Sequence, residues 1–177
     1  GEKVFDHIIG YDETVIPELE RAVLAGHSIN FLGLRGQGKT KMARLLVQLL
    51  DEYVPVIAGS VLNEDPLNPI TTASEKLIAE KGDETPINWW HRSDRYAEKL
   101  ATPDVNIADL IGDIDPIKAA HLKLSLSDEQ AINYGIIPRS NRGLFVINEL
   151  PDLQARIQVA LFNLLQEGDL QIRGHKF

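Results

Sequence analysis

The chain of 177 residues contains no cysteine, a single methionine and few aromatic residues, which make up 6% of it. Without cysteine it can form neither a disulfide framework nor a thiolate zinc site, and it has no cysteine nucleophile. No apolar run approaches the roughly 20 residues that a membrane-spanning helix needs. Charge at Glu2, Lys3 and Asp6 interrupts any signal-peptide pattern. We therefore expect a cytoplasmic protein without a membrane span.

Positive charge is scarce relative to negative charge. The 18 Lys and Arg residues against 26 Asp and Glu give a formal net charge of −8. This balance argues against a broad basic surface that follows phosphate backbones, so nucleic acid is not an expected partner. The apolar fraction of 44% is ordinary for a globular chain and, together with the length, predicts one compact domain over residues 1–177.

Hydrophobic spacing predicts alternating helices and strands in the first sixty residues. We expect a helix over 13–25, a buried strand over 28–33, a helix over 39–51 and a strand over 54–58. The order strand, helix, strand favours a βαβ unit in a parallel sheet and hence an α/β fold.

The later part of the chain carries further patterns. We expect helices over 71–81, where Thr71 is the cap, and over 88–100, and strand character over 106–111. Residues 118–138 are typical of an inserted mixture of helix and hairpin. Residues 143–147 predict a buried strand, 150–167 an amphipathic helix that ends at Gly168, and 169–174 one arm of a hairpin.

The segment Gly33-Leu34-Arg35-Gly36-Gln37-Gly38-Lys39-Thr40 fits the phosphate-binding pattern G-x-x-x-x-G-K-[ST] at every required position. Its glycines let backbone N–H groups surround phosphate oxygens, and the following helix directs its positive end at the same anion. Lys39 would reach the β- and γ-phosphates, and Thr40 would offer its hydroxyl oxygen to Mg²⁺. A glycine-rich turn with a chance Lys-Thr pair is the weaker alternative. We therefore assign nucleotide binding to Arg35, Gly36, Gln37, Gly38, Lys39, Thr40 and Lys41.

A nucleotide site also needs an apolar strand that ends in an acid, and Phe145-Val146-Ile147-Asn148-Glu149 supplies one. Glu149 would position or polarise the attacking water, so we assign catalysis to Glu149 and Lys39. The place of the Asp that supports Mg²⁺ holds Asn148, which keeps an acceptor oxygen but lacks the charge that helps to hold a hard cation. We expect reduced Mg²⁺ affinity or slow hydrolysis. The alternative is an ordinary strand end at which Glu149 favours a helix dipole.

These two motifs, together with His7-Ile8-Ile9-Gly10-Tyr11 before the first helix, resemble an AAA+ ATPase module. The resemblance implies that Ile8, Ile9 and Gly10 pack against the adenine ring. Residues 108–115 resemble the entry into the helix-2 insert of this family, and residues 135–143 resemble the return into its Walker B strand. The pattern is similar to the ATPase subunit I of magnesium chelatase and to the MoxR proteins, whereas nothing is recognisable over residues 60–104.

The resemblance implies a P-loop NTPase core with three layers, α/β/α, around a parallel sheet and with insertions at about residues 60–104 and 118–138. It implies ATP and Mg²⁺ as cofactors, assembly of the full-length protein into a ring, expected to be a hexamer, and a protein client that ATP hydrolysis remodels. In the family, the sensor 1 strand, the arginine finger and the helical lid follow the position of Phe177. We therefore expect this chain alone to bind nucleotide weakly and to hydrolyse little.

Two other functions stay open on the sequence. Asn148 is compatible with a non-catalytic scaffold or switch that responds to nucleotide. A nucleic-acid-linked AAA+ regulator, such as a sigma-54-dependent activator, is disfavoured by the net charge of −8 and by the lack of a G-A-F-T-G-A loop. Trp89 and Trp90 could stack on bases, but balanced charge around them favours a role in a core or a subunit contact.

Overall fold

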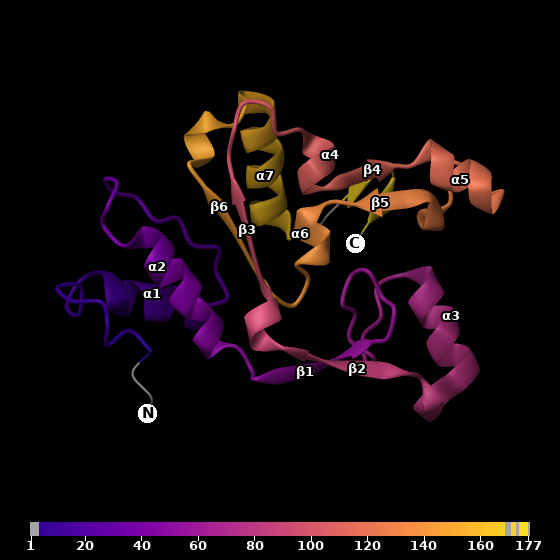
Figure 1. Ribbon diagram of the computed structural model, residues 1–177, viewed down its shortest axis with the longest axis horizontal. Coiled ribbons are helices and arrows are strands. Elements are labelled where there is room, and N and C mark those ends of the chain that lie inside the picture. The colour runs from indigo at the N-terminus through magenta and orange to yellow at the C-terminus, as the bar shows by residue number, and fades with distance from the viewer. Residues whose placement is uncertain (1–3, 169–170, 173, 177) are drawn as a thin grey trace. The chain divides into compact units, whose positions relative to one another are not determined.

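The computed structural model describes residues 4–168, 171–172 and 174–176, and it divides the chain into two compact units, Gly1–Glu52 and Tyr53–Phe177 (Figure 1). The fold is mixed α/β and includes a small parallel sheet. Among the described residues, no helix combines the length and the apolar character needed to cross a membrane.

The first unit is built from helices. The predicted helices over 13–25 and 39–51 are confirmed as α1 (Val15–Leu24) and α2 (Lys39–Leu45), and α2 continues as a 3-10 turn over Leu46–Leu49. Leu19 of α1 and Met42 and Ala43 of α2 are buried. The predicted strand over 28–33 is wrong. Within residues 4–52 no other strand forms, so the backbone of 28–33 has no partner there with which to pair.

The second unit starts with an antiparallel pair. β1 (Tyr53–Ile57) pairs with β2 (Ile87–His91), and α3 (Thr72–Lys81) with a 3-10 turn over Gly82–Glu84 lies between them in sequence. The predicted strand over 54–58 and helix over 71–81 are confirmed, and Thr71 caps the helix by accepting from the Ser74 N–H at 3.2 Å. The predicted βαβ unit is wrong for β1, because its partner strand is antiparallel.

The parallel pair consists of β3 (Tyr96–Leu100) and β6 (Leu144–Asn148), with Tyr96 opposite Leu144 and Leu100 opposite Asn148. The strand predicted over 143–147 is thus confirmed within one residue. The helix predicted over 88–100 is wrong, because this stretch forms β2, a 3-10 turn over Arg92–Asp94 and β3. Its aromatic residues fit a strand at least as well as a helix, and the pairing with a distant strand decides between them.

Arg95 fixes the start of this pair. Its carbonyl oxygen accepts from the Leu144 N–H at 2.7 Å, and its Nε donates to the carbonyl oxygen of Arg142 at 2.9 Å. Gly143 allows this approach, since a Cβ there would lie 2.5 Å from the Arg95 oxygen. The register of the two strands is therefore set from one end.

Between β3 and β6 the chain forms a helical and hairpin segment, as predicted for residues 118–138. A capping box starts its first helix: Asn106 Oδ1 accepts from the Asp109 N–H at 2.9 Å, and Asp109 Oδ2 accepts from the Asn106 N–H at 3.3 Å. The strand predicted over 106–111 is therefore wrong. β4 and β5 pair antiparallel. The elements are α4 (Ile107–Leu110), β4 (Gly112–Ile114), α5 (Pro116–Leu122), a 3-10 turn (Glu129–Ala131), β5 (Ile132–Tyr134) and α6 (Ile136–Arg139).

The core of the second unit lies between the parallel pair and α7 (Ala155–Glu167) (Figure 1). Phe145 and Ile147 of β6 pack there against a buried cluster. Because side chains alternate along a strand, α7 covers the face of the pair that carries these two residues. The buried members are Ala101, Val105, Leu110, Leu153, Ile157 and Leu161.

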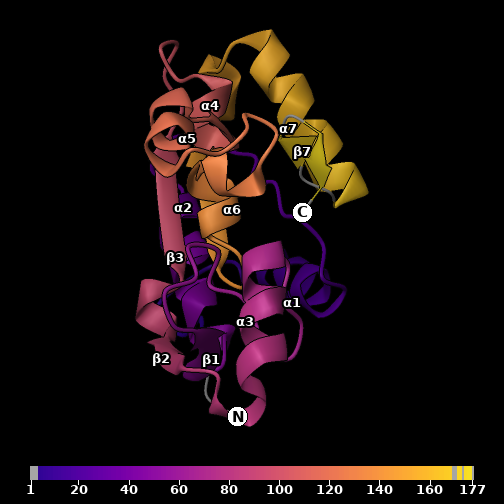
Figure 2. The same ribbon diagram turned by 90° about the vertical axis from the view of Figure 1, so that its right-hand side faces the viewer.

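The last helix starts later than predicted, after a 3-10 turn over Leu150–Asp152, and it ends as predicted at Gly168, whose φ is 72°. β7 (Gln171–Ile172) and β8 (His175–Lys176) then form an antiparallel pair beside the end of α7, where Ile172 packs near Leu164 (Figure 2). The hairpin arm predicted over 169–174 is confirmed at Gln171 and Ile172, which form β7. Asp169, Leu170 and Arg173 lie outside the described residues.

Candidate nucleotide-binding site

The loop that matches the phosphate-binding pattern leads directly into α2 in the first unit. Gly36 and Gly38 have φ of 82° and 75°, a conformation that side chains disfavour. Apart from the glycine itself and its two chain neighbours, no described atom lies within 4 Å of a Cβ built on either glycine. The glycines are thus needed for the turn of the backbone, and neighbouring atoms leave space beside that backbone.

Lys39 folds back over the same loop. Its Nζ donates to the carbonyl oxygens of Gly33 and Leu34, at 2.6 and 2.7 Å. An ammonium group has three donors, so it can bind a phosphate oxygen while it keeps a loop carbonyl. Thr40 lies on the first turn of α2 and is partly exposed, while Arg35 and Gln37 are exposed on the loop.

The segment predicted to hold adenine contacts the loop and α2. Lys41 Nζ donates to the carbonyl oxygen of His7 at 3.1 Å, and the Tyr11 hydroxyl donates to the carbonyl oxygen of Gln37 at 3.3 Å, across 34 and 26 positions of sequence. Within one unit, the structure thus brings together the two segments from which a nucleotide site was predicted.

The residues of this segment differ in exposure. Ile8 is buried, whereas Ile9 is 90% exposed, and Gly10 follows it with a φ of 87°. Ile9 is therefore the apolar side chain that can pack against a ring, and Ile8 stabilises the unit instead.

Asn148 and Glu149 lie at the carboxyl end of β6, in the second unit. The Asn148 carbonyl oxygen accepts from the Ala101 N–H at 2.8 Å, which extends the strand pairing. Glu149 is exposed and has φ 57° and ψ 44°, a left-handed conformation that costs about 1–2 kcal/mol for a residue with a side chain. Lys39 and Thr40 belong to the first unit, so the predicted residues form two local sets, each with its own geometry.

A carboxylate that the sequence analysis missed lies beside Asn148. The Asn148 Nδ2 donates to Glu98 Oε1, and the Tyr96 hydroxyl donates to Glu98 Oε2 at 3.0 Å. The alternation of Tyr96, Glu98 and Leu100 was a possible strand signal, but the helix predicted over 88–100 concealed it. Hydroxyl, amide and carboxylate oxygens are hard donors of the kind that suits Mg²⁺, and each unit carries some of them: Thr40 in the first, Asn148 and Glu98 in the second.

The described residues contain no group of three or more His, Cys, Asp or Glu side chains that could hold a metal ion. In nucleotide sites Mg²⁺ is typically held by one or two protein groups together with phosphates and water.

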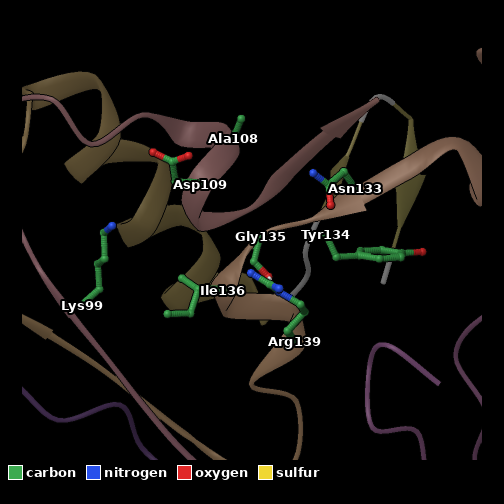
Figure 3. A pocket seen from close by; sticks show the side chains of 8 residues that line it. All are labelled: Lys99, Ala108, Asp109, Asn133, Tyr134, Gly135, Ile136 and Arg139. Carbon is green, nitrogen blue, oxygen red and sulfur yellow. Dashed lines mark hydrogen bonds between the residues drawn. The ribbon is translucent and has the colours of Figure 1, made fainter. Parts of the chain in front are cut away.

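A polar cavity of about 370 Å³ lies elsewhere in the second unit, beside the ends of α4 and β5. Figure 3 shows Lys99 and Asp109 on one side of it and Asn133 and Tyr134 on the other. Burial, together with the carboxylates of Glu129 and Glu64, raises the pKa of Tyr134. Lys99 follows Glu98 in β3 and so points to the opposite face of the strand. The cavity is lined by Lys99, Ala108, Asp109, Asn133, Tyr134, Gly135, Ile136 and Arg139.

Comparison of the chain with protein-family models, with curated proteins and with solved structures finds no match. The functional conclusion therefore rests on the residues and on the geometry of each unit.

Proposed function

We propose that the chain binds ATP through its first unit and is part of an AAA+ ATPase that remodels a partner protein. The observation that carries the proposal is the contact of the His7–Tyr11 segment with the phosphate-binding loop and α2, through Lys41 and Tyr11. A nucleotide needs an apolar surface for its base and a ring of donors for its phosphates. The segment and the loop that the proposal assigns to these two tasks belong to one unit of about fifty residues.

In this proposal each group has one task. Backbone N–H groups of the loop and the Lys39 ammonium bind phosphate oxygens, and Ile9 packs against the base. Thr40 would offer its hydroxyl oxygen to Mg²⁺, which supplies charge neutralisation between the β- and γ-phosphates. Glu149 would accept a hydrogen bond from the attacking water and then its proton.

The segment between β3 and β6 supports the AAA+ assignment. α4 leads into β4, β5 returns into α6, and the two strands pair antiparallel. α5 and a 3-10 turn lie between the two strands, so the segment combines helix with paired strands, and it is bounded by residues 108–115 and 135–143, which resemble the entry into the helix-2 insert and the return from it. A three-layer core, ring assembly and a protein client belong to the same proposal.

The test is the affinity for a fluorescent ATP analogue, titrated into the native chain and into Lys39→Ala. Removing hydrogen bonds from a charged donor costs about 1.5–3 kcal/mol, so we expect binding to weaken about 10- to 150-fold. Lys76→Ala, an exposed lysine of α3, is the matched control and should bind as the native chain does. Equal affinity of the native chain and Lys39→Ala would refute the site.

A second variant tests the base. Ile9→Ala should weaken binding of ATP but leave inorganic triphosphate, which has no base, unaffected. Competition of each ligand against the fluorescent analogue measures both affinities. A parallel loss for the two ligands would show that Ile9 acts through the fold of the loop and not through adenine.

A nucleotide-dependent switch that does not hydrolyse ATP is the second candidate, and Asn148 in place of an acid favours it. Phosphate release from the assembled ATPase to which the proposal assigns this chain, with its Glu149→Gln variant as a control, distinguishes the two. Tight binding with equal, background release from both proteins favours the switch. Release that Glu149→Gln abolishes favours the ATPase.

A further inference from the structure

The polar cavity of about 370 Å³ is a feature that the nucleotide motifs do not use. We propose that it binds a small hydroxylated acid, whose phosphate or carboxylate group contacts Lys99 and Arg139 and whose hydroxyl group donates to Asp109. All three residues belong to the second unit, so the inference does not rest on the proposed function or on the loop of the first unit. The volume is within the range of about 300–1,000 Å³ that is typical of pockets for small ligands.

The cavity forms where three segments of the second unit meet. Lys99 comes from β3, Asp109 from α4 and Arg139 from α6 (Figure 3). The last two segments are joined at Gly135, whose N–H donates to the carbonyl oxygen of Ile111, directly after α4, at 2.9 Å. The side chains of α4 and α6 that line the cavity are therefore held by one rigid corner of the fold. A preformed site of this kind loses little entropy when a ligand binds.

Lys99 stands at a position that packing does not explain. In the parallel pair it lies opposite Ile147, so it shares the face of the sheet that α7 covers. A lysine is disfavoured in a strand, and on a covered face packing alone would favour an apolar side chain. Lys99 is half-buried and lines the cavity. A ligand with a negative charge in that cavity accounts for a cation at this position.

Arg139 is oriented by the same corner of the fold. Its Nε donates to the carbonyl oxygen of Gly135 at 3.2 Å, and Figure 3 shows its side chain folded back toward Gly135. The terminal nitrogens carry further donors in the planar fork that suits a carboxylate or a phosphate. Two cations and one carboxylate give the charged lining a positive balance, in a chain whose formal net charge is −8. The cavity thus favours an anion where the chain as a whole does not.

Asp109 restricts which anion fits. Its Oδ2 accepts from the Asn106 N–H at 3.3 Å in the capping box, and its side chain also lines the cavity. An ionised carboxylate only accepts hydrogen bonds and repels a second anion, so it favours a ligand that brings a donor. The two cations disfavour an ammonium group as that donor. A neutral hydroxyl group beside the phosphate or carboxylate meets both conditions, which is why we assign a hydroxylated acid.

The test is a residue-resolved NMR titration of the whole chain with glycerol 3-phosphate, glycerate and glycerol. The first two carry a phosphate or a carboxylate beside hydroxyl groups, and glycerol lacks the anion. We expect saturable shifts of the Gly135 amide and of the Arg139 Nε–H signal with at least one of the two acids, and none with glycerol. Binding of glycerol 3-phosphate alone identifies a phosphate site, and binding of glycerate alone identifies a carboxylate site.

Two variants assign the roles of the charged residues. Hydrogen bonds to charged groups contribute about 10- to 150-fold to an affinity, so Lys99→Gln should weaken binding of the acid at least about 10-fold. Lys76→Gln, an exposed lysine of α3, is the matched control and should bind as the native chain does.

Asp109→Asn keeps an oxygen for the Asn106 N–H, so the start of α4 is preserved. It should reduce the preference for the hydroxylated acid over the analogue without hydroxyl groups, which is methyl phosphate or acetate. A merely structural role of Asp109 would change the stability of the second unit but not this ratio of affinities.

The outcomes separate this inference from the proposed function. Absence of saturable shifts at Gly135 and Arg139 with both acids overturns the site, and so does equal binding of glycerol. Equal affinity of the native chain and Lys99→Gln, or an equal loss in Lys76→Gln, overturns the role of Lys99. An unchanged preference in Asp109→Asn overturns selection through the hydroxyl group. The shifts should persist in Lys39→Ala, so failure of nucleotide binding leaves this inference standing.

Discussion

Glycines of the two units differ in what surrounds them. In the first unit, no described atom beyond the adjoining residues lies within 4 Å of a Cβ built on Gly36 or Gly38, and both have positive φ. In the second unit, a Cβ on Gly135 would lie 2.4 Å from the Leu110 carbonyl group, and Gly143 approaches Arg95 in the same way. Glycine is required at 36 and 38 because the backbone there has positive φ. At 135 and 143 it is required because neighbouring backbone atoms leave no room for a Cβ.

This difference bears on function. A glycine enclosed by backbone serves packing, and its place is already filled by the protein. A loop whose turn demands glycines with positive φ has the backbone form in which successive N–H groups can bind an anion. The comparison therefore predicts different consequences for the same substitution in the two units.

The largest effect is expected for Gly135→Ala. Its methyl group would overlap the backbone of Leu110 and Ile111, which cannot move without shifting α4. We expect a loss of about 3 kcal/mol in the free energy of unfolding of the second unit. Urea denaturation followed by tryptophan fluorescence reports on this unit alone, because both tryptophans lie in β2. A loss below about 1 kcal/mol would contradict close packing at this site.

The second unit also encloses a carboxylate. Glu64 is 1% exposed, and burial raises its pKa, but hydrogen bonds from Ser60, Ser74, Thr71 and Ile70 outweigh burial and lower the pKa below 4.5. A lowered pKa stabilises the fold above pH 4.5, and this contribution is lost as the pH falls through the folded-state pKa.

Glu64→Gln tests this packing at two pH values. At pH 7 it should reduce the free energy of unfolding by about 1–3 kcal/mol, because a donor replaces an acceptor among buried donors. The difference between the native chain and the variant should shrink on acidification below pH 4.5, as Glu64 becomes protonated. Urea midpoints across this range measure it, and a constant difference would disprove the role of the charge.

A smaller effect is expected for Gly36→Ala in the loop. No overlap arises there, so the cost is the left-handed conformation, about 1–2 kcal/mol. Hydrogen exchange of the α1 and α2 amides measures it separately from the second unit. ATP affinity should fall as well, since the methyl group lies beside the loop donors. A cost equal to that of Gly135→Ala would remove the contrast between the units.

The smallest effect is expected for Glu149→Asn, at the end of β6. Asparagine adopts positive φ more readily than glutamate, so the second unit should gain about 0.5 kcal/mol in the free energy of unfolding. Phosphate release should be lost at the same time if Glu149 acts on water. Stability unchanged or lowered would show that other contacts of Glu149 outweigh its backbone strain.

The sequence predicts the turn of the loop and the start of α2, because neighbouring residues encode both. Gly36, Gly38 and Lys39 specify the turn and the charge within a few positions, and α1, α2 and α3 follow equally local signals. Glu98 could not be predicted in this way. Its position beside Asn148 depends on the pairing of β3 with β6, and a helical spacing of aromatic residues concealed β3.

The same limit explains the strand predicted over 28–33. Its apolar pattern is that of a buried strand, but a strand also needs a partner for its backbone, which spacing along the chain does not reveal. At Asn106 the signal was local and was still missed. Its capping box with Asp109 starts a helix, but the apolar residues over 106–111 led to the prediction of a strand.

The bonds that Arg95 makes at the start of β3 determine where the chain can change length. Deleting one residue between Arg95 and Glu98 would turn Glu98 toward Phe145 and Ile147, and its carboxylate would enter the core. The stretch over 123–128, between α5 and the turn at Glu129, has no such register to keep. Insertions and deletions should thus be tolerated in that loop. A change of length by one residue between Arg95 and Glu98 should destabilise the second unit.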